Sequence, residues 1–333
     1  MITLGIETSC DETSCAILEN GDKILSNIVS SSLEKHQPFG GIVPEIASRH
    51  ALENINIVFQ EALKKAGVSI YDIDLVSVTY GPGLIGSLLV GISFAKALAY
   101  NRKVKLIGVN HLEAHLEANL IGQPLQENSY LGLIVSGGHT ILVLYRDGKF
   151  KKLGGTVDDA VGEAYDKVAK LIGLGYPGGP IIDKLAANGN QKKFRFTKPK
   201  LDSELDFSFS GIKTAVLHLV EDLGNEIHSD AGNLAASFQY AVVGWLAEGV
   251  RRACLQTRIK QVLVGGGVSA NSLLRSKLKE LAAEMELTLY IPPMALTNDN
   301  AAMIAKSGYE KHQNGVKSGF DLSAMPNLRI GGL

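Results

Sequence analysis

Two histidines four residues apart, His111 and His115, are the side chains of this sequence best suited to hold a metal ion. The surrounding segment is predicted to be helical, and residues i and i+4 of a helix lie on one face. Two imidazoles on one face provide half of a transition-metal site. The alternative interpretation is a pair of polar histidines on a solvated helix face.

The spacing is that of a zinc protease, but the carboxylate lies in a different position. In a His-Glu-x-x-His helix, the glutamate follows the first histidine directly and acts as general base. Here Leu112 occupies that position and Glu113 comes next. Two residues turn a helix by about 200°, so we expect Glu113 to point away from a metal held by both histidines. A metal-dependent peptidase is therefore an alternative that the sequence disfavours.

Carboxylates elsewhere in the chain could complete such a site. Asp299 precedes a helix-like run, so it is either a third metal ligand or the N-cap of that helix. Asp11 and Glu12 lie in a polar turn between two strand-like segments. Because two carboxylates repel a phosphate, this turn suits a cation, a hydroxyl or an amine, unless it is only a solvated turn.

Three glycine-rich turns predict a nucleotide or phosphate site. They are Ser136–Gly138, Tyr176–Pro180 and Gly265–Gly267. Glycines let backbone N–H groups approach an anion, and a helix N-terminus adds a favourable dipole. Neither a Gly-x-x-x-x-Gly-Lys-Ser/Thr motif nor a complete Gly-x-Gly-x-x-Gly motif occurs at these turns, which disfavours a P-loop and a standard dinucleotide fold.

A basic segment at residues 192–200 contains five cationic residues and two phenylalanines. The net charge of the whole chain is only −1, so a nucleic-acid partner would have to meet a local patch of this kind. The composition suits contact with RNA phosphates and stacking on bases, or else a solvated loop. A second basic cluster comprises Arg251, Arg252, Arg258 and Lys260.

An internal repeat indicates how these residues are positioned. A strand, a small polar turn and a second strand are predicted over residues 3–18, and the same pattern returns over 130–145. Between and after these hairpins we predict helices at 44–66, 83–100 and 158–172. The repeat predicts an α/β protein of two related halves that face each other across a cleft.

The length of 333 residues agrees with two domains. The three cysteines show no framework spacing, and the N-terminus lacks the basic region of a signal peptide. The apolar segment 83–100 is interrupted by glycines, serines and a lysine, which favours a buried helix over a membrane span. These features predict a soluble, cytoplasmic protein without a membrane partner.

Ordered motifs along almost the whole chain resemble the TsaD family, the bacterial-type tRNA N6-adenosine threonylcarbamoyltransferases once described as O-sialoglycoprotein endopeptidases. The motifs are Gly-Ile-Glu-Thr-Ser-Cys-Asp-Glu-Thr (5–13), Gly-Gly-Ile-Val-Pro-Glu-Ile-Ala-Ser-Arg (40–49), Gly-Pro-Gly-Leu (81–84), His-Leu-Glu-Ala-His (111–115), Val-Ser-Gly-Gly-His-Thr (135–140), Asp-Asp-Ala-Val-Gly-Glu-Ala-Tyr-Asp-Lys (158–167), Tyr-Pro-Gly-Gly-Pro (176–180), Asp-Phe-Ser-Phe-Ser-Gly-Ile-Lys-Thr (206–214), Gly-Gly-Gly-Val-Ser-Ala-Asn (265–271) and Thr-Asn-Asp-Asn (297–300).

The resemblance implies an actin/Hsp70/sugar-kinase-like (ASKHA) fold of two duplicated halves with a nucleotide cleft between them. We expect an N-terminal half at residues 1–129, joined by the C-terminal segment 300–333, and a C-terminal half at 130–299. The implied enzyme transfers the threonylcarbamoyl group of threonylcarbamoyl-AMP to N6 of the tRNA adenosine next to the anticodon (position 37) and releases AMP.

The resemblance also implies a set of site residues. One divalent metal, Fe²⁺ or Zn²⁺, would be held by His111, His115 and Asp299. Apart from the resemblance, we expect Asp11 or Glu12 to accept the amine proton or to orient the target base. The residues implied to contact the donor are Ile134, Val135, Ser136, Gly137, Gly138, Asp166, Gly179, Asp183 and Asn271.

The family usually works with partners. They are the tRNA anticodon loop, a metal-lacking paralogue, a small ATPase and an enzyme that makes the donor. We expect the paralogue to pair through the N-terminal half, where the small residues of helix 83–100 permit close packing. Besides the peptidase, two alternatives are an ASKHA-type small-molecule kinase and a non-catalytic scaffold, which would not need the His/His/Asp set.

Overall fold

The computed structural model describes residues 1–224 and 227–332, and it divides into two compact units. Unit 1 comprises Met1–Gln126 and Asn298–Leu333, and unit 2 comprises Glu127–Thr297. Leu333, the end of the expected C-terminal segment, lies outside the described residues. The sequence-based division falls after residues 129 and 299, whereas these units divide after 126 and 297. Asp299 therefore belongs to the same unit as both histidines.

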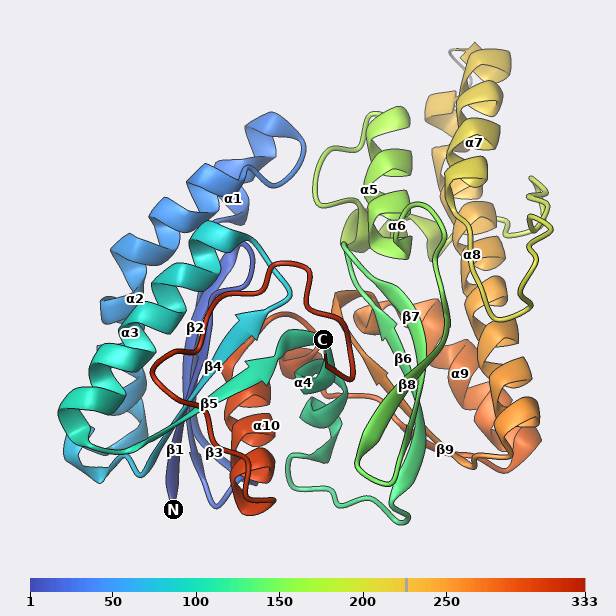
Figure 1. The fold of residues 1–333 in the computed structure, drawn as a ribbon. Helices are drawn as coiled ribbons and strands as arrows, with labels where there is room; N and C mark the ends of the chain where they lie inside the picture. Colours follow the sequence, from blue (N-terminus) through green and yellow to red (C-terminus); the bar gives the residue numbers. More distant parts are fainter. Residues whose placement is uncertain (225–226, 333) are drawn as a thin grey trace. The chain divides into compact units, whose positions relative to one another are not determined.

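The sheet of unit 1 has five strands in the order β3-β2-β1-β4-β5 (Figure 1). β1 pairs with β2 antiparallel and with β4 parallel, while β2–β3 is antiparallel and β4–β5 parallel. The strands are β1 (Ile2–Glu7), β2 (Glu12–Glu19), β3 (Lys23–Ser31), β4 (Leu75–Gly81) and β5 (Lys105–Asn110).

Helices cover both faces of this sheet, α2 and α3 on one face and α10 on the other (Figure 1). Alternation along β1 explains the two layers: Leu4 and Ile6 join the core beneath α2 and α3, whereas Gly5 faces α10. A Cβ atom at Gly5 would lie 2.1 Å from the carbonyl oxygen of Ala301. The helices of unit 1 are α1 (Leu33–His36), α2 (Pro44–Ala66), α3 (Ile85–Arg102), α4 (His111–Glu117) and α10 (Ala301–Gln313).

Local signals in the sequence predicted α2 and α3 well. Pro44 occupies the first turn of α2, and Gly67 follows its end in the left-handed conformation with φ of 68°. α3 buries one face against the sheet, where its Gly91 packs against Thr8. Ile85 and Leu89 on another face are exposed, so the predicted buried helix is buried only in part. Among the described residues, no helix has the length and apolar character that crossing a membrane requires.

The sheet of unit 2 repeats the topology of the first. Its order is β10-β9-β6-β7-β8, with β6 antiparallel to β7 and parallel to β9. β6 therefore corresponds to β1, and the predicted duplication of an α/β half is confirmed. The strands are β6 (Ser129–Val135), β7 (Thr140–Arg146), β8 (Lys149–Gly155), β9 (Gln261–Gly265) and β10 (Thr288–Tyr290).

The long helix α8 packs on β6 and β7 and contacts α6, α7 and α9. Its Gly249 lies against the rings of Phe207, and the core beneath it is rich in valine, leucine and phenylalanine. The helices of unit 2 are α5 (Val161–Leu171), α6 (Gly178–Ala186), α7 (Ser210–Leu223), α8 (Ile227–Thr257) and α9 (Ser272–Met285).

Three elements of unit 2 are absent from the sequence-based prediction. β8 contains three lysines, all exposed, so it lacks the apolar alternation of a buried strand. β10 is only three residues long. α6 starts inside the Tyr176–Pro180 run that the sequence suggested as a turn, because prolines and glycines are tolerated in the first turn of a helix.

Candidate metal centre and nucleotide-binding turns

The helix that carries both histidines starts directly at the carboxyl end of β5. The side-chain oxygen of Asn110 caps it by accepting the N–H groups of Leu112 (2.9 Å) and Glu113 (3.4 Å). Both imidazoles therefore project from the first two turns of α4, and their ring centroids lie 4.6 Å apart. The predicted helix and the common face of the two histidines are confirmed.

The carboxylate of Asp299 lies beside the two rings. Its Oδ1 is 3.1 Å from His115 Nε2 and 3.5 Å from His111 Nε2, and one ligand atom from each residue lies within 4.8 Å of the others. Asn300, not Asp299, caps α10 by accepting the N–H of Met303 at 3.2 Å. The N-cap alternative for Asp299 is therefore wrong.

Burial distinguishes this cluster from a surface pair of histidines. His111 is 8% exposed and His115 only 1%, so neither lies on a solvated face. Within the described structure, neither ring nitrogen of His115 has a hydrogen-bond partner, although Nε2 lies close to Asp299. A buried polar atom without a hydrogen bond is costly, and two imidazoles with a carboxylate are ligands that iron and zinc accept. The donor set thus fits a transition-metal ion.

Glu7, a residue that the sequence-based prediction did not include, orients His111. Its Oε2 lies 3.1 Å from Nδ1 of His111 and accepts the Thr79 hydroxyl at 2.6 Å. Its Oε1 accepts the backbone N–H of Ser9 at 2.5 Å. With Nδ1 directed at Glu7, Nε2 of His111 faces Asp299. The sequence contains one signal that could have identified Glu7. This residue ends a strand that is parallel to β4, and the carboxyl ends of parallel strands share an edge of the sheet.

Electrostatics favours a charged His111 in the metal-free protein. Burial lowers the pKa of this imidazole, but the carboxylates of Asp299 and Glu7 raise it more, to about 9. The ring therefore carries a proton at neutral pH, and a metal ion would have to displace it.

Glu113 points away from the histidines, as predicted. Its carboxylate accepts Lys311 Nζ at 2.8 Å and the backbone N–H of Gly331 at 3.2 Å. This residue ties α4 to α10 and to the C-terminal segment, so it is not positioned to act as the base of a peptidase.

The acidic turn of unit 1, which contains Asp11 and Glu12, interacts electrostatically with Asp299. Burial, followed by the charges of Asp299 and Asp11, raises the pKa of Glu12 well above its usual value. The backbone of Asp11 is fixed by Ser32, whose N–H and hydroxyl both donate to its carbonyl oxygen, at 3.0 and 2.8 Å. The turn therefore presents a carboxyl group that holds a proton more readily than an exposed glutamic acid.

In unit 2, the β6–β7 hairpin presents glycine backbone to open space. Ser136 N–H donates to the carbonyl of His139 at 2.8 Å and its hydroxyl accepts the His139 N–H at 3.1 Å, which closes the turn. A Cβ atom at Gly137 or Gly138 would meet nothing within 4 Å. Ile134 and Val135 are buried in β6, so they contribute backbone rather than side chains at this turn.

The other glycines fall into two groups. Gly179 also faces open space, whereas a Cβ atom at Gly178 would lie 2.5 Å from the carbonyl oxygen of Tyr165. Gly266 has φ of 92° and packs on the backbone of Val135. Gly178 and Gly266 are thus required for packing. Gly179, like Gly137 and Gly138, leaves its backbone open to a ligand.

Three predicted residues form the polar contacts of the α6 and α9 termini. Asp166 accepts the backbone N–H of Gly178 at 2.7 Å and so fixes the start of α6. Asn271 caps α9 and donates to Asp183 Oδ1 at 3.1 Å and to Gln239 Oε1 at 2.8 Å. A cavity of about 280 Å³ adjoins this network and is lined by Asp183, Gln239, Ser272 and Ser276 among others. The structure thus brings Asp183 and Asn271 into contact.

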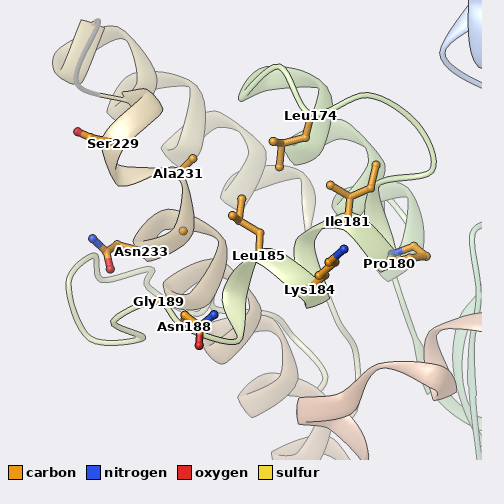
Figure 2. A pocket seen from close by; sticks show the side chains of 11 residues that line it. Leu174, Pro180, Ile181, Lys184, Leu185, Asn188, Gly189, Ser229, Ala231 and Asn233 are labelled. Atoms are coloured by element: carbon orange, nitrogen blue, oxygen red, sulfur yellow. The ribbon is translucent and has the colours of Figure 1, made fainter.

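A larger cavity of about 870 Å³ lies between α6 and α8 (Figure 2). Leu174, Ile181 and Leu185 give it a largely apolar wall, and Lys184 also lines it. None of the sequence-predicted site residues lines it. Size alone therefore does not identify the candidate site.

Known proteins similar to this chain agree with these observations. A family model described as TsaD: tRNA N6-adenosine threonylcarbamoyltransferase matches residues 23–306. Proteins with that name from Thermosipho africanus (strain TCF52B) and Dictyoglomus turgidum (strain DSM 6724 / Z-1310) are each 53% identical to it. The alignments cover 99% of this chain in both cases, and 100% and 99% of the relatives.

A solved structure, T. kodakarensis HypF, matches with a TM-score of 0.63 at 14% identity, covering 94% of this chain and 48% of that one. At this identity the likeness shows the fold alone, and together with the two duplicated sheets it confirms the predicted ASKHA class. From the family match and the full-length relatives, we conclude that the chain belongs to the TsaD family of tRNA N6-adenosine threonylcarbamoyltransferases.

Proposed function

We propose that this chain transfers the threonylcarbamoyl group of threonylcarbamoyl-AMP to N6 of the tRNA adenosine just 3′ of the anticodon, and that AMP is released. The observation that carries the proposal is the convergence of two buried histidines and Asp299 in a member of this family. The test is incubation of the purified chain and its partners with unmodified tRNA and the donor, followed by mass spectrometry of the nucleosides. Absence of threonylcarbamoyladenosine would refute the proposal.

We further propose that His111, His115 and Asp299 hold one divalent ion, Fe²⁺ or Zn²⁺. When bound, such an ion would polarise and orient the donor as a Lewis acid. Two observations support this assignment: His111 is hydrogen-bonded to Glu7, and neither nitrogen of His115 has a hydrogen-bond partner among the described residues.

Other residues of the chain are proposed to bind the donor and to accept the proton of the attacking amine. Backbone N–H groups of Gly137 and Gly138 are proposed to hold the phosphate, and the Asp183–Asn271 pair the adenosine. The adenine N6 attacks the carbonyl carbon, a C–N bond forms, and the bond from that carbon to the AMP oxygen breaks. Glu12 is the proposed acceptor of the amine proton, because burial and the nearby carboxylates raise its pKa and make it a stronger base than an exposed glutamate.

Two other functions are less well supported by the site. The ion pair of Glu113 with Lys311 leaves a peptidase without its base. An ASKHA-type kinase relies on Mg²⁺, which prefers oxygen ligands, whereas two of the three candidate ligands here are imidazoles.

We propose that the metal-lacking paralogue docks on α2 and α3. Leu52, Ile85 and Leu89 are between 50% and 68% exposed, and the last two lie four residues apart on one face of α3. A small ATPase and a donor-producing enzyme complete the proposed set of partners, and a tRNA substrate suits a cytoplasmic reaction.

Leu89→Glu is expected to prevent stable pairing with the paralogue, because it would bury a charge in an apolar contact. Size-exclusion chromatography with light scattering would show the mixture as two separate species. Leu255→Glu, at another exposed leucine on α8, is the matched control and should leave pairing intact. A stable complex containing the Leu89→Glu chain would rule out this docking surface.

Metal binding is expected to release about one proton at pH 7. The pKa of His111 is raised from 6.5 to about 9, so its proton stabilises the metal-free protein below pH 6.5, and this stabilisation is lost as the pH rises towards 9. The apparent affinity for Zn²⁺ should therefore rise roughly tenfold per pH unit up to about pH 9. Calorimetry in buffers of different ionisation enthalpy counts the proton, and a count of zero at pH 7 would contradict the assignment.

A further inference from the structure

The basic segment 192–200 is fixed along the surface of α8. Asn190 N–H donates to Asn233 Oδ1 at 2.8 Å, and Phe194 N–H donates to Ser237 Oγ at 3.1 Å. Further on, Lys198 lines a small hollow beside Trp245. The segment therefore follows α8 from about residue 233 to 245, a length of roughly 18 Å at 1.5 Å per residue.

The two phenylalanines of this segment anchor it. Phe194 and Phe196 are partly buried and pack against the core of unit 2. Their rings are therefore not presented for stacking on bases, which sequence composition alone had suggested. Alternation instead directs Arg195, between them, outward to solvent.

Three cations of the segment are exposed and, among the described residues, have no acidic partner. Within the described part of the chain, no carboxylate forms an ion pair with Lys192, Arg195 or Lys200, and all three are exposed. Lys193 is different, because it pairs with Asp230. Acidic side chains begin only after the segment, at Asp202.

In the second basic cluster, the two neighbouring arginines are paired with acids. Arg251 forms an ion pair with Glu284, and Arg252 forms pairs with Glu248 and with Glu204. Their charges are thus neutralised within the protein. Arg258 and Lys260 of the second cluster are also exposed. Lys192, Arg195 and Lys200 differ from them in lying together on the segment that follows α8.

We propose that Lys192, Arg195 and Lys200 bind the phosphate backbone of the tRNA substrate. This inference rests on the proposed function, which supplies a tRNA as the polyanion. A chain of net charge −1 has to bind RNA through a local patch. Because the aromatic rings face inward, the patch offers charge without the aromatic anchors typical of protein interfaces. Such contacts position the RNA without reading its sequence.

The test is the salt dependence of tRNA binding by the triple variant Lys192→Gln/Arg195→Gln/Lys200→Gln. The probe is an unmodified tRNA transcript whose anticodon is followed by adenosine, titrated by fluorescence anisotropy at several KCl concentrations without donor. Each lost phosphate contact lowers the slope of log K against log salt by about 1, so the slope should fall by about 2 to 3. We expect at least tenfold weaker binding at low salt, with unchanged thermal melting and metal content.

A matched control removes three exposed cations from other surfaces of unit 2. Lys149→Gln/Lys151→Gln/Lys279→Gln alters β8 and α9 and should leave the slope at its wild-type value. A wild-type slope in the test variant, or an equal loss in the control, would overturn the proposal. Because binding is measured without the donor, a failure of threonylcarbamoyl transfer would leave this result interpretable. Where transfer occurs, the variant should raise KM for tRNA and keep kcat.

Discussion

The double variant His111→Ala/His115→Ala is expected to lose its metal and to transfer threonylcarbamoyl at least about 1,000-fold more slowly than the wild-type chain. The change removes two of the three candidate ligands and leaves Asp299 alone. A 1,000-fold loss corresponds to about 4 kcal/mol of transition-state stabilisation, a magnitude that loss of an electrostatic catalyst can produce. Rates come from single-turnover assays at saturating tRNA and donor, and metal content from elemental analysis.

A matched control separates this effect from the general loss of two histidines. His218 is largely exposed on α7 and His312 lies in the last turn of α10. The variant His218→Ala/His312→Ala should keep both the metal and the rate. If the His111→Ala/His115→Ala chain keeps full transfer activity while folded, the histidines have no role in the reaction.

Glu7→Gln is expected to weaken the affinity for Zn²⁺ by about 10- to 100-fold, the usual cost of removing a carboxylate that orients a metal-bound histidine. The substitution keeps the shape of the side chain but removes the negative charge 3.1 Å from His111 Nδ1. That charge holds the proton of the metal-bound imidazole on Nδ1 and makes Nε2 of His111 a better metal ligand. Competition with a chelator measures the affinity, and the visible spectrum of the Co²⁺ form reports ligand geometry.

The control for Glu7 is Asp158→Asn in unit 2. Asp158 also accepts several hydrogen bonds, from Ser208, Phe209 and Ser210, but it is far along the chain from the candidate ligands. Both variants make the same carboxylate-to-amide change, so a general loss of stability would appear in each. Wild-type affinity and an unchanged Co²⁺ spectrum in Glu7→Gln would show that Glu7 does not orient His111.

Local patterns explain what could be predicted from the sequence. The common face of His111 and His115 and the outward direction of Glu113 follow from helix geometry alone. The duplication was visible because both hairpins repeat the same strand–turn–strand pattern. Segments without apolar periodicity, such as the lysine-rich β8, gave no such signal.

Long-range contacts explain what could not be predicted. Asp299 and Asn300 are both good helix caps, and only tertiary structure shows that Asn300 performs the capping while Asp299 turns to the histidines. The role of Glu7 depends on Thr79 in β4 and on His111 at the start of α4, both far from Glu7 in the sequence. Likewise, the inward direction of Phe194 is set by the core of unit 2 rather than by its neighbours in sequence.

The most direct measurement is an anomalous-difference map of crystals grown with Fe²⁺ or Zn²⁺ and a bound nucleotide, collected on both sides of the metal absorption edge. We predict one peak about 2.0–2.2 Å from a ring nitrogen of His111, from a ring nitrogen of His115 and from a carboxylate oxygen of Asp299. A peak at another site, or no peak between these three residues in crystals that contain the metal, would contradict the proposed centre.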